Sequence, residues 1–226
     1  MQDAAATSSD PLSTAEDGIL IDPADAVLVF LDHQSGLLPT VRDVEVNRLR
    51  RNVLALAKLT TLLGIPAITT ASEPDGPNGP PLPEILDAAP HTVAVQRKGE
   101  VNAWDSEAFR AAVKATGRST LIMCGVWTSV CVMLPALDAK AAGFKVYAVT
   151  DASGDVSEMS SRTTLARFTQ AGVIPTSTNA VISEVHRTWN RPEAAELAEL
   201  YGIVSPNFAA AMACYQNARA VKRPVG

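Results

Sequence analysis

The 226-residue sequence has only three cysteines, and no two of them form a C-x-x-C pair. An odd number of scattered cysteines favours free thiols in a reducing compartment over a disulfide framework or a zinc site. The sequence also has no run of about 18 apolar residues, which excludes a transmembrane span. Its first residues carry neither the positive region nor the apolar core of a secretory signal. We therefore expect a cytoplasmic protein that does not bind a membrane.

Basic clusters are absent as well. The chain has 19 Lys and Arg against 24 Asp and Glu, a formal net charge of -5, which disfavours nucleic acid or an anionic membrane as the main partner. A hydrophobic content of 47% is typical of a globular protein, and the length suits one large domain. We expect residues 1–18, which are small, polar and acidic, to be a flexible lead-in. Residues 19–226 then form one domain, with 205–226 as a C-terminal helical tail.

Short apolar runs alternate with segments of helical spacing about six times along the chain. This pattern, with short connections, predicts an α/β fold of three α/β/α layers around a parallel, doubly wound sheet of about six strands. The segment 73–83 has five prolines and two glycines and is expected to be an exposed loop. Asp105 is the expected N-cap of the helix at 106–116. The expected strands are 26–31, 65–70, 92–96, 120–124, 144–149 and 173–176, and the expected helices are 46–63, 106–116, 129–142, 158–171, 192–200 and 206–220.

In such folds ligands bind beyond the carboxyl ends of the strands, where the winding direction reverses. Asp32 follows the first expected strand, Arg97 and Lys98 follow the third, and residues 151–155 follow the fifth. Cys131 lies in the first turn of the helix after the fourth strand, where the helix dipole and unpaired N–H groups lower the pKa of a thiol.

Asp32, Lys98 and Cys131 form a chemical set if their strands are neighbours at the sheet centre. The carboxylate can act as general base for the thiol, and the ammonium can stabilise the thiolate. Each residue also has a structural alternative: a small core cysteine, an aspartate in a turn, and a solvated lysine. His33 adjoins Asp32, but neighbouring side chains at a strand end point apart, so we expect no catalytic role for it.

Three motifs in order resemble the isochorismatase-like cysteine hydrolase superfamily: FLDHQSGLL (30–38), QRKGEVNAWDSEAF (96–109) and CGVWTSVCVMLPALDA (124–139). SEPDGPNGP (72–80) is similar to the YcaC type within it. The resemblance implies that Asp32 is the base, Lys98 the middle member of the triad and Cys131 the nucleophile. It also implies a cis peptide between Val126 and Trp127, and an oxyanion hole formed by the backbone N–H groups of Trp127 and Cys131.

Neighbouring subfamilies narrow the expected chemistry. Nicotinamidases resemble the chain in the triad, but they bind a metal through an Asp-x-His pair and a further histidine. The loop after the second strand has Glu73 and Asp75 but no histidine, and His91 precedes the third strand at the opposite sheet edge. We therefore expect no metal and no cofactor. True isochorismatases lack the cysteine and cleave a vinyl ether, so Cys131 favours a small amide, imide or carbamoyl substrate, hydrolysed through a thioester.

The walls of the substrate pocket are less constrained by the sequence. Gln34, Asn102, Trp104 and Trp127 lie close to the triad in sequence and are the candidates, although Trp104 at a helix entrance is as often a packing anchor. His186 is expected in a loop before Trp189, with a structural role.

Two other classes of protein are compatible with the expected fold. A dinucleotide-binding oxidoreductase is excluded, because FLDHQSG stands where a G-x-G-x-x-G motif would follow the first strand. A catalytically weak oligomeric binding protein of the same fold stays open. The resemblance also implies a homo-octamer, with the proline-rich loop and the helical tail as expected contacts.

Overall fold

The computed structural model describes residues 19–221, so the lead-in expected at 1–18 lies outside the described residues. One parallel sheet has the spatial order β3-β2-β1-β4-β5-β6, so the winding direction reverses between β1 and β4. The prediction of a doubly wound parallel sheet is confirmed. The strands are β1 (Ala26–Leu31), β2 (Ala67–Ser72), β3 (Val93–Arg97), β4 (Thr120–Gly125), β5 (Lys145–Val149) and β6 (Ile174–Thr176).

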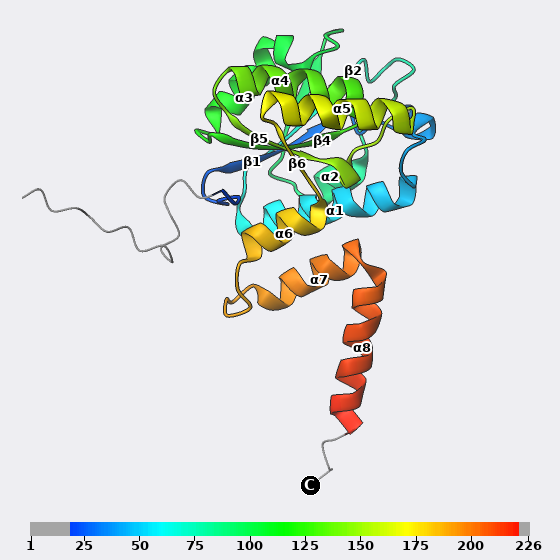
Figure 1. The fold of residues 1–226 in the computed structure, drawn as a ribbon, viewed down its shortest axis with the longest axis vertical. Helices are drawn as coiled ribbons and strands as arrows, with labels where there is room; N and C mark the ends of the chain where they lie inside the picture. Colours follow the sequence, from blue (N-terminus) through cyan, green and yellow to red (C-terminus); the bar gives the residue numbers. More distant parts are fainter. Residues whose placement is uncertain (1–18, 222–226) are drawn as a thin grey trace, which may run out of the picture.

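Helices cover both faces of this sheet and form the outer layers of the fold (Figure 1). One face is covered by α1 (Val46–Leu63), α6 (Thr178–His186) and α7 (Ala194–Val204), and the other by α3 (Glu107–Ala115), α4 (Met133–Ala141) and α5 (Glu158–Ala171). The short helix α2 (Pro83–Ala88) follows the proline-rich loop and contacts α1.

Alternate side chains of each central strand enter two separate cores. In β1, Leu28 and Phe30 pack toward α1, whereas Val29 and Leu31 pack toward α3 and α4. All six residues of β1 are buried, which is why the strand reads as a continuous apolar run without polar alternation. The same alternation determines on which face of the sheet each polar residue emerges at the carboxyl edge.

Local signals in the sequence determine where the helices begin and end. The Glu45 side chain accepts hydrogen bonds from the first backbone N–H groups of α1, and Gly64, at a φ of 65°, ends that helix in the left-handed conformation. Asp105 was the expected cap of α3, but the cap is Ser106, whose hydroxyl accepts from the N–H of Phe109. Asp105 instead lies within a 3-10 turn, Ala103–Asp105, that precedes the cap.

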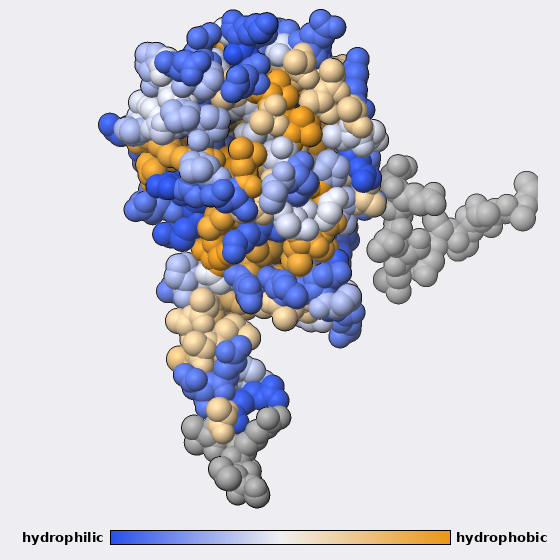
Figure 2. All heavy atoms as spheres, turned by 180° about the vertical axis from the view of Figure 1, so that it is seen from behind, coloured by the Kyte–Doolittle hydropathy of each residue, from blue (hydrophilic) through white to orange (hydrophobic). Residues whose placement is uncertain are grey.

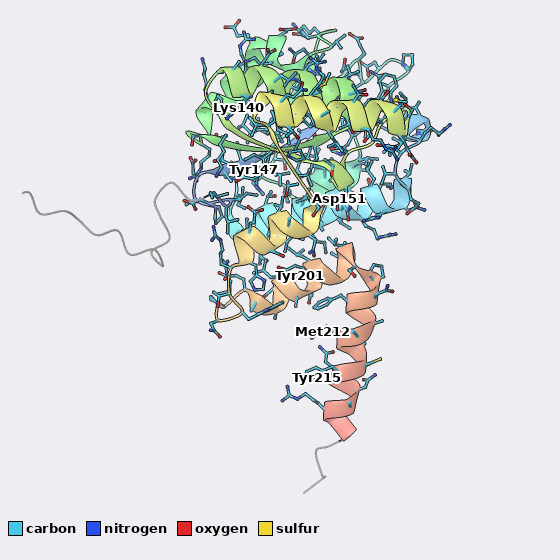
Figure 3. The ribbon with its side chains drawn as sticks, viewed as in Figure 1. Lys140, Tyr147, Asp151, Tyr201, Met212 and Tyr215 are labelled. Atoms are coloured by element: carbon cyan, nitrogen blue, oxygen red, sulfur yellow. The ribbon has the colours of Figure 1, made fainter. Side chains whose placement is uncertain are left out.

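The C-terminal segment extends the layer that contains α1 and α6. The helix α7 packs on α1, and α8 (Pro206–Val221) contacts α7 and then runs away from the body of the molecule (Figure 1). Figure 2 shows weakly apolar and hydrophilic residues side by side along this protruding helix, and Figure 3 places Met212 and Tyr215 on it and Tyr201 on α7. None of the helices in the described part of the chain combines the length and apolarity needed to cross a membrane.

The helices α2 and α6 were not expected, and the prediction that His186 lies in a loop is wrong. His186 is the last residue of α6, where its Nδ1 contacts the Tyr201 hydroxyl at 3.2 Å and its ring meets Trp189 edge-on. The helix has only nine residues, too few for a helical period to stand out in the sequence.

Candidate active site

Asp32 and Cys131 meet at the carboxyl edge of the two central strands. Asp32 directly follows β1, has a φ of 52° and is almost completely buried. Cys131 lies in a π-helical turn, Thr128–Val132, that connects the end of β4 to α4. The Asp32 carboxylate lies beside the Cys131 thiol, close enough for its charge to raise the pKa of that thiol. Asp32 and Cys131 therefore lie together at the sheet edge where the sequence predicted them, at the point where the winding reverses.

The cation beside Asp32 is Arg97, and this corrects the prediction of Lys98. The Arg97 guanidinium forms a buried ion pair in which Nη2 donates to both carboxylate oxygens of Asp32. Lys98 is exposed, and its backbone N–H donates to the side chain of Glu100. Arg97 therefore occupies the place at the site that was assigned to Lys98.

The sheet register explains why the arginine, and not the lysine, faces the site. Val95 packs in the same core as Ile68, so Arg97, two residues further along β3, emerges on the same face as Thr70. The Nε of Arg97 donates to the Thr70 hydroxyl at 3.1 Å on its way across β2. Successive residues of a strand point to opposite faces, so Lys98 faces away.

The expectation that all three strands are neighbours is also wrong. β3 is an edge strand, and β2 separates it from β1. The long guanidinium side chain spans β2, and its Nη1 donates to the backbone oxygens of Glu100 and Val101 at 2.7 and 3.0 Å. Every N–H of the guanidinium therefore has an acceptor, and the side chain is held in one orientation.

The pKa of the Cys131 thiol is raised above its ordinary value, contrary to the expectation from its position in the first helical turn. Burial is the largest cause, because only 9% of the residue is exposed, and the negative charge of Asp32 and the hydrogen bond to it act in the same direction. The backbone N–H of Trp127 and the charge of Arg97 lower the pKa, but they do not offset burial. At rest the site holds a neutral thiol beside an acceptor.

The turn before Cys131 has the geometry that the family resemblance implies. The peptide bond between Val126 and Trp127 is cis, and the backbone N–H of Trp127 donates to the sulfur of Cys131. The indole Nε1 of Trp127 donates to the Thr40 hydroxyl at 2.6 Å, which holds the half-buried ring over the start of the turn. Trp127 is therefore the predicted pocket residue that the structure brings to the thiol.

Gln34 is fully buried, and its side chain fixes the proline-rich loop to the end of β2. Its amide nitrogen donates to the backbone oxygens of Ser72 and Gly79 at 3.0 and 2.6 Å, and its amide oxygen accepts from the N–H of Ser72. Two of these contacts are with Ser72, the last residue of β2, and one is with Gly79 in the loop. The structure therefore gives Gln34 a structural role, which differs from the predicted contact with substrate.

Asn102 and Trp104 also make structural contacts. Asn102 accepts from the N–H of Trp104 and donates to the Asp138 carboxylate on α4 at 2.7 Å. The Trp104 ring packs edge-on against Phe109 and Phe144. These contacts anchor the loop after β3 against α3 and α4, so the packing alternative holds for Trp104.

Sequence reasoning missed two further buried groups at this edge. The His33 Nε2 donates to the backbone oxygen of Ala152 at 2.9 Å, and burial lowers the pKa of the ring to about 4. Asp155 accepts hydrogen bonds from Ser129, two residues before Cys131. The position of Asp155 after β5, at the carboxyl edge of the sheet, was the sequence signal that could have identified it. Within residues 19–221 no three His, Cys, Asp or Glu side chains lie close enough together to hold a metal ion.

Comparisons with known proteins identify the family of the chain. The isochorismatase domain model matches residues 26–180. The chain is 43% identical to the probable hydrolase YcaC of Escherichia coli over 87% of this chain and 94% of that protein. It is 27% identical to isochorismatase domain-containing protein 2 of Danio rerio over 80% of this chain and 89% of that protein.

Solved structures show the same similarity. The YcaC gene product of Escherichia coli, described as an octameric hydrolase of unknown specificity, superposes with a TM-score of 0.85 at 41% identity, covering 90% of this chain and 99% of that one. YcaC from Pseudomonas aeruginosa, solved with hexane-2,5-diol and covalent acrylamide, gives 0.84 at 41% identity, covering 88% and 98%. The chain belongs to the isochorismatase family.

Proposed function

We propose that the protein is a cysteine hydrolase that cleaves the C–N bond of a small amide, imide or carbamoyl compound through a thioester on Cys131. The observation that carries this proposal is the position of the buried thiol beside Asp32, whose carboxylate is in turn paired with Arg97. A nucleophile, a base and a group that orients the base are the parts that covalent catalysis needs.

In the first half of the reaction, Asp32 takes the thiol proton as the sulfur attacks the carbonyl carbon. The C–S bond forms, and the carbonyl π electrons move to the oxygen, which becomes an oxyanion. The backbone N–H groups of Trp127 and Cys131 are the proposed donors to that oxyanion. When the tetrahedral intermediate collapses, the C–N bond breaks, and the leaving nitrogen takes the proton from Asp32.

In the second half, Asp32 takes a proton from water while the water oxygen attacks the thioester carbon. The C–S bond breaks, the acid product leaves, and the sulfur recovers its proton from Asp32. Arg97 contacts neither the sulfur nor the attacking water in this scheme. It keeps both carboxylate oxygens of Asp32 oriented, because its Nη2 donates to both of them.

The raised pKa of Cys131 fits a mechanism in which deprotonation accompanies attack. A free thiolate would be disfavoured in this buried site, so reactivity depends on a base that already lies beside the thiol. Lys98 has no part in this scheme.

Two features of the relatives support the proposal. Acrylamide is an electrophile that adds to thiols, and the Pseudomonas aeruginosa relative contains covalent acrylamide. The Escherichia coli relative is an octamer, and we propose a homo-octamer for this chain as well.

The alternative is an oligomeric binding protein with the same fold and little turnover. The burial of Cys131 and the raised pKa of its thiol favour this alternative, since both oppose reaction with a substrate. The two functions differ in whether Asp32 makes Cys131 reactive at neutral pH.

The test is the rate of acrylamide addition to each cysteine between pH 5.5 and 9, measured by peptide mass spectrometry. Exposed Cys214 serves as the internal reference for an accessible thiol. Cys131 should react at a rate that is nearly constant across neutral pH. Asp32→Asn should lower that rate by about 100-fold or more, because the base is lost while the side-chain size is kept.

Arg97 and Lys98 form a matched pair of cations for the control. Arg97→Lys should slow Cys131 labelling markedly, because an ammonium cannot also make the contacts with Thr70 and the two backbone oxygens that hold the side chain against Asp32. Lys98→Ala should change the rate less than twofold, and circular dichroism should verify the fold of each variant. A screen of amides, imides and carbamoyl compounds against wild type and Cys131→Ala then identifies the substrate class. Labelling of Cys131 only above about pH 8, with no dependence on Asp32, would refute the hydrolase and leave the binding protein.

A further inference from the structure

We propose that Asp155 is a positioning residue for the nucleophile: it fixes the turn that carries Cys131, so that the thiol stays between the Asp32 carboxylate and the Trp127 N–H. This inference rests on the proposed function and adds to it a residue from a third strand end. Asp155 lies six residues beyond the last residue of β5, outside the family motifs of the sequence.

The carboxylate of Asp155 caps the turn that begins at Thr128. One oxygen accepts from the backbone N–H of Ser129 at 2.8 Å, and the other accepts from the Ser129 hydroxyl at 2.9 Å and from the N–H of Val156 at 2.8 Å. Side-chain oxygens in this position satisfy N–H groups that the first helical turn leaves unpaired. Ser129 is therefore held through both its backbone and its side chain, two residues before Cys131.

Asp155 is completely buried, and no basic side chain pairs with it among the ion pairs of the described residues. A buried carboxylate is costly unless hydrogen bonds compensate for its lost hydration. The three donors supply that compensation, and two of them belong to Ser129. Displacement of Ser129 would therefore remove two of the three hydrogen bonds that stabilise the buried carboxylate.

The backbone on either side of Asp155 is fixed as well. Its N–H donates to the Asp43 carboxylate at 2.7 Å, and its carbonyl oxygen accepts from the N–H of Arg42 at 2.8 Å. The preceding Gly154 accepts from the N–H of Thr128 at 2.9 Å. The carboxylate therefore projects from a fixed segment, so it can hold the nucleophile turn in place and does not follow its movements.

Asp151 provides a matched control four residues earlier in the chain. Its carboxylate also accepts from the backbone N–H and the hydroxyl of a single residue, Thr178, at 2.7 and 2.8 Å. Thr178 begins α6 on the opposite face of the sheet, and Figure 3 shows Asp151 between the sheet and the start of this helix. The two aspartates thus make the same kind of cap, but only Asp155 caps the turn that contains the nucleophile.

Replacement of Asp155 by asparagine should give a partial defect. An amide has a single acceptor oxygen, and the N–H groups of Ser129 and Val156 approach different oxygens of the carboxylate. Either orientation of the amide therefore sets its NH₂ group against one of these N–H donors. Alanine removes all three hydrogen bonds, so the order of effects should be alanine, then asparagine, then wild type.

The experiment measures the acrylamide rate constants of Cys131 and Cys214 between pH 5.5 and 9 in Asp155→Ala, Asp155→Asn, Asp151→Ala and Asp151→Asn. Asp155→Ala should lower the Cys131 rate at pH 7 by at least about tenfold, since displacement of a reacting atom by about 1 Å can cost about 100-fold. Its pH profile should also approach that of an ordinary thiol, because the sulfur has left Asp32. The Asp151 variants should keep the wild-type Cys131 profile within twofold while losing thermal stability.

Amide hydrogen exchange provides a second readout that is independent of reactivity. Exchange of peptides that cover 127–132 should accelerate in the Asp155 variants and stay unchanged in the Asp151 variants. The inference is overturned if Asp155→Asn and Asp155→Ala keep the wild-type Cys131 rate and profile, or if the Asp151 variants lose as much. Failure of the proposed function gives a different result: the Cys131 rate would not change in Asp32→Asn, with Asp155 intact. That result would also refute the proposed role of Asp155.

Discussion

Replacement of His33 by glutamine should reduce the loss in the free energy of unfolding that acidification causes. His33 is buried beside the catalytic edge, its Nε2 donates to the backbone oxygen of Ala152, and its ring packs edge-on against Phe30. No acceptor among the described residues faces the buried Nδ1. Protonation would therefore place a charge in an apolar site with one N–H unpaired. Glutamine keeps a donor near the position of Nε2 and does not titrate.

The magnitude follows from the pKa of the ring, which burial lowers from 6.5 to about 4. A pKa that is lower in the folded state gives stability that is present above pH 6.5 and is lost as the pH falls toward 4. Each pKa unit corresponds to about 1.4 kcal/mol, so the group accounts for a loss of about 2 kcal/mol between pH 7 and pH 5. The full loss, complete near pH 4, is about 3 kcal/mol.

Urea unfolding of wild type and His33→Gln at pH 7, 6 and 5, at one protein concentration, measures this difference. The carboxylates titrate in both proteins, so their contribution cancels in the comparison. The free energy of unfolding of wild type should fall by about 2 kcal/mol more than that of the variant between pH 7 and pH 5. Parallel curves for the two proteins would refute the assignment of His33 as a buried neutral base.

Three further predictions concern the same edge of the sheet. Gly125→Ala should lower the melting temperature and cost about 1–3 kcal/mol, because its Cβ would overlap the backbone oxygen of the last β1 residue; an unchanged melting temperature would contradict this. Gln34→Ala removes two hydrogen bonds to Ser72 at the end of β2 and one to Gly79 in the proline-rich loop, so limited proteolysis should cut within 73–83 faster while the domain stays folded, and equal cleavage rates would argue against the anchor. The raised thiol pKa values of Cys124 and Cys131 imply stability that is present below pH 9.0 and is lost as the pH rises above it. In urea unfolding, Cys124→Ala or Cys131→Ala should each reduce that alkaline slope by about 1.4 kcal/mol per pH unit, and an unaltered slope would contradict the shift.

The fold was predictable because its central elements satisfy local and global requirements together. β1 and α1 have the predicted bounds, since a strand buried on both faces is continuously apolar and α1 ends at a glycine. The elements that were missed are short: α2 begins at a proline in a proline-rich region, and α6 has nine residues. Their helical state depends on packing against the domain and on caps such as Asp151, which come from elsewhere in the chain.

The direction of the Cys131 pKa shift shows where a local rule fails. The position in a first helical turn was predicted correctly, and it favours a thiolate. The thiol is nevertheless almost fully buried beside an ionised carboxylate, and these two effects outweigh the N–H of Trp127 and the charge of Arg97. The burial of Cys131 depends on the whole fold, so it could not be predicted from the sequence around this residue.

The choice between Arg97 and Lys98 depended on the face of a single strand end. Both residues follow the apolar part of β3, and either cation would suit a carboxylate chemically. Counting from Val95, which alternates with exposed neighbours, places residue 97 on the core face and residue 98 off it. The side chain must also span β2 to reach Asp32. This favours arginine, because a guanidinium can donate to Thr70, to two backbone oxygens and to Asp32 at once. A lysine at 97 would leave some of these acceptors unpaired, which is why the strand alternation and the hydrogen-bond capacity of the side chain point to the same residue.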